Sequence, residues 1–225
     1  SRRQRQMCIR DSPGAAAQYS KDSIWLSDCT IQANIKLDYA GANWTEIMDI
    51  GYKNENQKGK IMAVQATDLS SSRLIFEVSA NAGLGQNSIW RTADVPAEHN
   101  LFTDGWVKLR VDLNGENVKI SLDDELLIEA TGYKLPNAWL GFKPGSASTL
   151  YLDNLLITRK LADTPAVEED PSRYTILYQD FEKLSQGTED ELAAIGYDEV
   201  VSFGGSIETG FEDKGQAFNF IGSYY

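Results

Sequence analysis

Histidine and cysteine are scarce in this chain, which holds one histidine and two cysteines among its 225 residues. Two cysteines do not indicate a disulfide framework, and Cys29 occupies an inward position of a predicted strand, where it would serve as a small core residue. The single histidine, His99, lies in the loop sequence VPAEHNLF, where we expect it to be solvated. No serine or cysteine has the sequence context of a catalytic nucleophile.

The chain also lacks long apolar runs and is poor in basic residues. No apolar stretch approaches the length of a membrane span, so we expect no membrane insertion. The 21 basic and 33 acidic residues give a net charge of −12. Such a chain repels phosphate backbones, so we expect no nucleic-acid partner, whereas its many carboxylates suit Ca²⁺.

Helical periodicity is nearly absent, and residues 104–130 show instead the two-residue period of β-strands. Apolar and polar residues alternate over residues 107–113 and again over 118–122. The pairs Asn114-Gly115 and Asp123-Asp124 lie where turns are needed. This β-meander requires a second sheet to cover its apolar face.

Strand patterns recur through the rest of the chain and predict an all-β fold, a two-sheet antiparallel β-sandwich. One short helix is expected near residues 188–195, and Trp25, Trp106 and Trp139 are expected in the core. Further strands are predicted over residues 29–37, 46–53, 59–66, 74–78, 88–93, 139–142 and 150–158.

The first 13 residues differ in character from the rest of the chain. Residues 1–13 are rich in arginine and resemble the translated adapter peptide found at the ends of assembled environmental reads. On that interpretation the chain is a metagenomic fragment of a longer protein. The alternative is a disordered basic tail.

Two short segments, one near each end of the chain, indicate an interrupted tandem repeat. The sequence GQAFNF after residue 214 resembles GAAAQY after residue 13. Residues 14–160 are therefore predicted to be a sandwich lacking its first strands, 161–173 a linker rich in proline and acids, and 174–225 the first strands of a second copy. We expect 174–225 to complete the first sandwich; the alternative is an incomplete sandwich with a separate tail.

Four segments resemble the closing half of a concanavalin A-like jelly roll, the laminin G-like and lectin/glucanase superfamily. They are Trp106–Leu113, Val118–Leu126, Leu140–Phe142 and Tyr151–Ile157. The resemblance implies an extracellular or cell-surface protein, expected to be bacterial, with neighbouring domains in the same chain. The superfamily includes sugar-binding modules, glycoside hydrolases, polysaccharide lyases and adhesion modules. The resemblance is therefore specific for fold and not for function.

The catalytic residues of the enzymes in this superfamily are not found. Retaining glucanases on this fold place Glu-x-Asp-x-Glu on one strand, and the sequence has no such triplet. Asp123-Asp124-Glu125 places neighbours on opposite faces and is expected to form a turn. We therefore expect a non-catalytic module; a truncated glycoside hydrolase or polysaccharide lyase is the alternative.

A calcium site is implied by the same resemblance. Related jelly rolls often carry a structural Ca²⁺ where the first and last strands meet, and the matching residues are Asp153, Asp180 and Glu182. The alternative is that Asp153 and Asn154 make local hydrogen bonds that end a strand.

A glycan is the expected partner, because sugar rings stack on aromatic faces and sugar hydroxyls pair with planar polar groups. The alternative is a structural or adhesive spacer repeat without a sugar site. An exposed aromatic pair on the concave sheet would favour the first, and a smooth polar face the second. The candidate ligand-binding residues are Trp44, Trp90, Arg91, Glu46, Gln65 and Glu77.

Overall fold

The computed structural model describes the side chains of residues 26, 28–38, 44–51, 56–65, 71–102, 105–136, 140–142 and 149–159, and the backbone of several further strands. Within this part of the chain, helical structure consists of short 3-10 turns, η1 (Glu55–Gln57), η2 (Ala82–Leu84) and η3 (Ala97–His99). None of its helices has the length and apolar character needed to cross a membrane. The predicted helix near 188–195 and the linker 161–173 lie outside the described residues.

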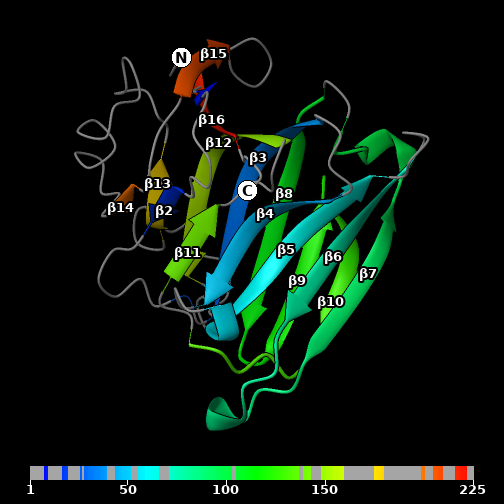
Figure 1. Ribbon diagram of the computed structural model, residues 1–225, viewed down its shortest axis with the longest axis vertical. Helices are drawn as coiled ribbons and strands as arrows, with labels where there is room; N and C mark the ends of the chain where they lie inside the picture. Colours follow the sequence, from blue (N-terminus) through cyan, green and yellow to red (C-terminus); the bar gives the residue numbers. More distant parts are fainter. Residues whose placement is uncertain are drawn as a thin grey trace, which may run out of the picture.

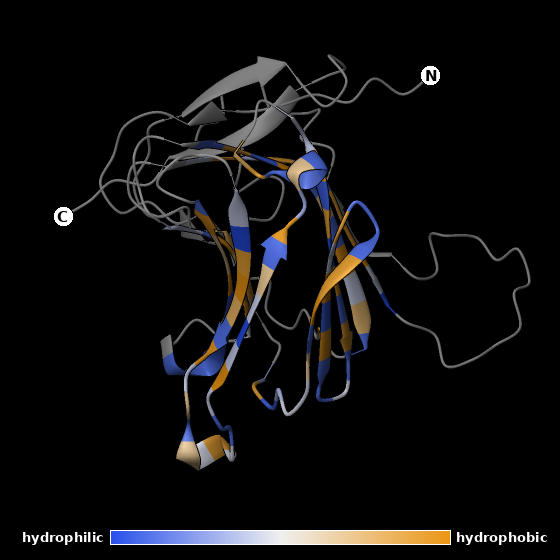
Figure 2. Cartoon of the chain, turned by 90° about the vertical axis from the view of Figure 1, so that its right-hand side faces the viewer, coloured by the Kyte–Doolittle hydropathy of each residue, from blue (hydrophilic) through white to orange (hydrophobic). Residues whose placement is uncertain are grey.

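The strands form two antiparallel sheets, so the prediction of an all-β sandwich is confirmed (Figure 1). Figure 2 shows the sheets as separate layers. Five strands of the first sheet, ending at its edge, have the order β12 (Ser148–Arg159), β3 (Cys29–Tyr39), β8 (Val107–Asn114), β9 (Asn117–Leu122) and β10 (Glu125–Ala130). The second has β11 (Trp139–Phe142), β4 (Trp44–Gly51), β5 (Lys58–Gln65), β6 (Ser72–Val78) and β7 (Ile89–Val95).

The core lies between the sheets and is built by the predicted alternation. In β8, Val107, Leu109 and Val111 are buried while the residues between them are half-buried. Cys29 is buried, as expected of a small core residue. Trp106 was expected in the core, but it precedes the inward-facing Val107, is half-buried, and its ring packs edge-on against Tyr151 with centroids 6.4 Å apart.

The turns of the β8–β9–β10 meander follow the sequence closely. Asn114 pairs with Asn117, so the two central residues of the first turn are Gly115 and Glu116, one position later than the predicted pair. Gly115 has φ +58°, which glycine adopts without strain. Asp123 and Asp124 form the second turn as predicted, both at positive φ, and the backbone N–H of Lys108 donates to Asp123 Oδ1 at 2.8 Å.

Strands from both ends of the chain join these sheets. β12 pairs along one edge with β16 (Gln216–Ile221) and β13 (Thr175–Gln179). β15 (Gly205–Thr209) pairs with β16 and with β1 (Cys8–Ile9). In the second sheet, β2 (Ala17–Tyr19) pairs with β11 and with β14 (Glu199–Val200).

Candidate functional site

The outer face of the second sheet, turned away from the core, gathers most of the predicted ligand-binding residues. Residues paired across antiparallel strands share a face, so the register of β4–β7 assigns each side chain to the core or to this outer surface. We call this surface the site face. Its members are Trp44, Glu46 and Asp49 of β4, Lys58, Lys60, Met62 and Val64 of β5, Arg73, Ile75 and Glu77 of β6, and Trp90, Thr92 and Asp94 of β7.

A β-bulge in β4 places two carboxylates on the site face. The register shifts between Glu46, opposite Met62, and Met48, opposite Ile61. Ile47 and Met48 are both buried in the core, which leaves Glu46 and Asp49 on the outer side. In a regular strand, residues three apart would point to opposite faces, so this pairing of acids was not predicted from the sequence.

Each of these acids is bound to a lysine of β5. Lys58 Nζ lies 2.7 Å from Asp49 Oδ2, and both side chains are almost fully buried. Lys60 Nζ lies 3.3 Å from Glu46 Oε1. Burial and then the charge of Glu46 raise the pKa of Asp49 from 3.8 to about 6, although Lys58 acts in the opposite direction.

A hollow of about 540 Å³ opens over the ends of β5, β6 and β7. Trp90 lines it with 56% of its surface exposed, and Arg73 Nε pairs with Asp94 Oδ1 at 2.9 Å in its wall. Gln65 Oε1 and Ser72 Oγ also belong to lining residues; both atoms are buried and have no hydrogen-bond partner in the described part of the chain. The hollow therefore combines an exposed aromatic face with an exposed ion pair.

The predicted ligand-binding residues do not all lie together. Trp44 and Trp90 are exposed on the site face, where Glu46 is buried and Glu77 is half-buried. Gln65 alternates to the core side of β5 and reaches the hollow at the end of the strand. Arg91 does not join them, because it pairs with the core residue Phe76 on the opposite face. No sequence pattern pointed to five further charged residues of the site face, Asp49, Lys58, Lys60, Arg73 and Asp94.

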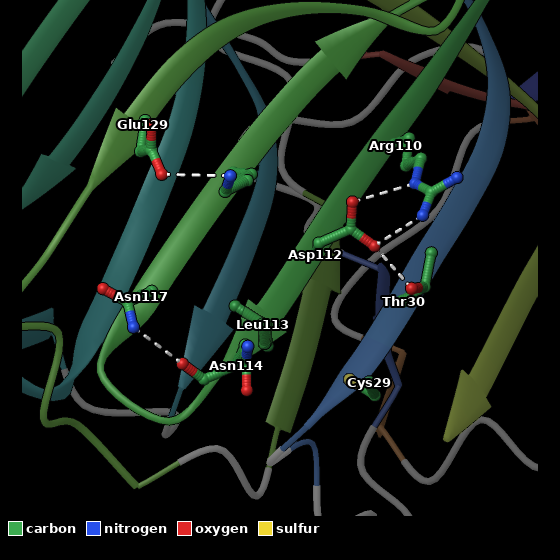
Figure 3. A pocket seen from close by; sticks show the side chains of 9 residues that line it. Cys29, Thr30, Arg110, Asp112, Leu113, Asn114, Asn117 and Glu129 are labelled. Carbon is green, nitrogen blue, oxygen red and sulfur yellow. Dashed lines mark hydrogen bonds and ion pairs between the residues drawn. The ribbon is translucent and has the colours of Figure 1, made fainter. Parts of the chain in front are cut away.

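A second hollow, of about 520 Å³, lies over β3, β8, β9 and β10 of the other sheet (Figure 3). Its charged side chains are already paired, Arg110 with Asp112 at 2.9 Å and Lys119 with Glu129 at 3.1 Å. Thr30 Oγ1 also donates to Asp112. None of the described residues that line this hollow is aromatic. This second hollow therefore gives a sugar ring fewer contacts than the hollow beside Trp90 does.

His99 was expected to be solvated, but the structure places it between other side chains. Its side chain is 17% exposed and lies between two carboxylates, with Nδ1 2.8 Å from Asp123 Oδ2 and Nε2 3.3 Å from Glu125 Oε2. These contacts tie η3 to the β9–β10 turn. The turn residues could not be matched to His99 from the sequence, because they lie 24 residues further along the chain.

The predicted calcium ligands are only partly within the described residues. Asp153 is fully buried in β12, and the backbone N–H of Asn154 donates to its Oδ1 at 2.7 Å beside a bulge. Asn154 has φ +52°. The local hydrogen bond of the alternative is therefore present, but it accompanies a bulge within β12 and does not end the strand, which continues to Arg159. Asp180 and Glu182 lie outside the described residues. Among the residues that are described, no three histidine, cysteine, aspartate or glutamate side chains are grouped to hold a metal.

No protein-family description and no curated protein matches this chain. Several solved structures have a similar fold. A carbohydrate-binding module, CBM66 from Bacillus subtilis, is 17% identical with a TM-score of 0.47 over 65% of this chain and 83% of that one. A Bacteroides ovatus mixed-linkage glucan GH16 protein is 12% identical with a TM-score of 0.43, over 61% and 70%.

Tailspike protein 2 from an Escherichia coli O157:H7 bacteriophage is 10% identical with a TM-score of 0.51, and the match covers 80% of this chain and 30% of that one. At this identity the likeness to the tailspike protein concerns the fold alone. The antiparallel β-sandwich of two sheets that the sequence predicts is the architecture that the structure has.

Proposed function

We propose that this jelly roll is a non-catalytic carbohydrate-binding module of a larger extracellular protein, and that the glycan binds on the site face beside Trp90. The observation that carries the proposal is the exposed ring of Trp90 in a hollow with the Arg73–Asp94 pair. Large aromatic side chains are normally buried, so one left exposed in a hollow indicates a surface that binds a partner.

The chemistry of the hollow suits a sugar. The indole face of Trp90 can stack on the apolar side of a pyranose or furanose ring. Carboxylate and guanidinium groups such as those of Asp94 and Arg73 can exchange hydrogen bonds with neighbouring hydroxyls. Gln65 and Ser72 line the same hollow, but their unpaired oxygen atoms are buried and do not face a ligand. A spacer repeat without a sugar site, the main alternative, gives no reason for this combination.

The acids of β4 are the observation that favours the enzymatic alternative. Glu46 and Asp49 share the site face, and a carboxyl group with a pKa of about 6 is suited to general acid catalysis. However, each acid is ion-paired with a lysine, and Asp49 is only 1% exposed. We therefore assign them a role in holding β4 against β5. A release of reducing ends from a bound glycan that is lost in Asp49→Asn would overturn this assignment.

Replacing Trp90 by alanine should weaken glycan binding at least about tenfold, because the stacking surface is removed while the fold keeps its core. A glycan array identifies a bound polysaccharide, and isothermal titration with that polysaccharide compares the variant with the original chain. Leu126→Ala is the matched control, since Leu126 is 48% exposed on β10 of the other sheet. Binding that survives in Trp90→Ala, or no binding to any glycan, contradicts the proposal.

Calcium remains a prediction that depends on Asp153 together with Asp180 and Glu182. If all three hold the ion, saturating Ca²⁺ should raise the melting temperature, because an ion that binds only the folded state adds about 2.7 kcal/mol at 100 times its Kd. Differential scanning fluorimetry with Ca²⁺ and then with a chelator measures the shift. The shift should vanish in Asp180→Asn, and an equal melting temperature with and without Ca²⁺ would remove the site.

We also propose that residues 174–225 open a second copy of the module and complete the sheet of the first. The pairing of β12 with β13 and β16 supports this, since both strands come from that segment. An edge strand left without such partners would present its backbone N–H and C=O groups to other chains.

A further inference from the structure

Four of the apolar side chains of the site face form one continuous diagonal line. Trp44 of β4 is the diagonal neighbour of Met62, which pairs directly with Ile75, and Ile75 is the diagonal neighbour of Trp90. The two tryptophans at its ends are exposed, and the two side chains between them are 6% exposed. The line therefore offers an exposed ring at each end, while Met62 and Ile75 between them are almost fully covered.

The length of this line exceeds what one sugar ring can cover. Trp44 and Trp90 are three strand spacings apart, about 14 Å, and four residues apart along the strands, about 13 Å, which gives about 20 Å in total. A ligand that uses both rings must be an oligosaccharide that lies obliquely across β4–β7.

The charges beside the line point to an uncharged ligand. The site face carries four acids, Glu46, Asp49, Glu77 and Asp94, and three bases, Lys58, Lys60 and Arg73, a net charge of −1. Each base is already paired with one of the acids, at 2.7, 3.3 and 2.9 Å. The carboxylates of an acidic polysaccharide would meet acids here, on a chain whose net charge is −12.

We infer that the ligand is an extended, neutral polysaccharide bound along the line from Trp44 to Trp90; the inference rests on the proposed function and specifies its ligand class. Trp90 in its hollow is the primary contact. Trp44 adds a second contact that a short sugar bound at Trp90 does not reach.

Isothermal titration with oligosaccharides of two lengths and two charges tests this inference. The probes are the disaccharides and hexasaccharides of cellulose, xylan, mannan and levan, with hexagalacturonate and hexaguluronate as the acidic set. One neutral hexasaccharide should bind roughly tenfold or more tightly than its own disaccharide, as one added aromatic contact allows. Trp44→Ala should remove that difference. Leu84→Ala is the matched control, because Leu84 is 38% exposed away from the site face.

The outcomes separate this inference from the function on which it rests. No binding of any probe, neutral or acidic, overturns the proposed function. Equal affinity for the disaccharide and the hexasaccharide, unaffected by Trp44→Ala, overturns the extended path and leaves sugar binding at Trp90 standing. Tighter binding of an acidic hexasaccharide than of every neutral one overturns the neutral class. Trp44→Phe, which keeps an aromatic ring, should retain most of the length dependence.

Discussion

Replacing Lys58 by methionine should lower the free energy of unfolding by about 3–5 kcal/mol at pH 8, although the change keeps a long apolar side chain. Lys58 is 4% exposed and Asp49 is 1% exposed, so the variant leaves a carboxylate buried without its counter-ion. Removing one partner of such a pair costs more than the pair itself contributes, because the remaining charge has lost its solvation. Urea denaturation of both chains at pH 8 measures the difference.

The pH dependence of that loss distinguishes a charge effect from a packing effect. The folded-state pKa of Asp49, about 6, is above its ordinary 3.8, so the folded chain takes up this proton first as the pH falls. The Asp49 contribution to stability is therefore full below about pH 4 and declines as the pH rises through about 6. Without Lys58 the pKa rises further, so we expect Lys58→Met to regain most of its stability at pH 5.

A double replacement provides the control for this pair. Asp49→Leu combined with Lys58→Met removes both charges from the same buried site, and exchanging a buried ion pair for apolar side chains is often neutral or stabilising. We expect the double variant to be at least as stable as the original chain at pH 8, and to show no Asp49-dependent slope between pH 4 and 6. A loss that is equal at pH 5 and pH 8, or equal in the single and double variants, would refute the buried-charge explanation.

The fold could be predicted because its signal is local. In β3 and β8, every second side chain faces the core, so the two-residue period of the sequence is also the period of burial. The turn at Asp123-Asp124 was equally visible, since aspartate tolerates positive φ. At Gly115 the residue type was right, but the cross-strand pairing moved the turn by one position, and that pairing is not a local property.

The site was only half predictable because it depends on register and on one bulge. Trp44 and Trp90 could be selected as tryptophans in a turn and on a short strand, and both are exposed. The bulge after Glu46 adds one residue to β4, which brings Asp49 to the same face, and no sequence pattern announces it. The neighbours of each tryptophan follow from pairings between strands that the sequence alone does not align.

The second large effect is expected in the core between the sheets, at Phe76. Phe76 is fully buried, and its ring lies 5.9 Å from that of Tyr133. The Tyr133 hydroxyl donates to the backbone carbonyl of Ile50 at 2.7 Å, so the tyrosine ring is held in place and cannot fill a space left beside it. Phe76→Ala should therefore create a cavity and lower the free energy of unfolding by about 3–5 kcal/mol.

Gly59 allows this prediction to be checked by a double-mutant cycle. A Cβ atom on Gly59 would lie 2.9 Å from the Phe76 ring, so Gly59→Ala should destabilise the original chain by overpacking, by about 1–3 kcal/mol. In Phe76→Ala the contact with the Phe76 ring is gone while a contact of 3.1 Å with Tyr133 remains, so the same replacement should cost less than it does in the original chain. Urea denaturation of the four chains gives the coupling energy. Additive losses would show that the Phe76 ring does not occupy the space above Gly59.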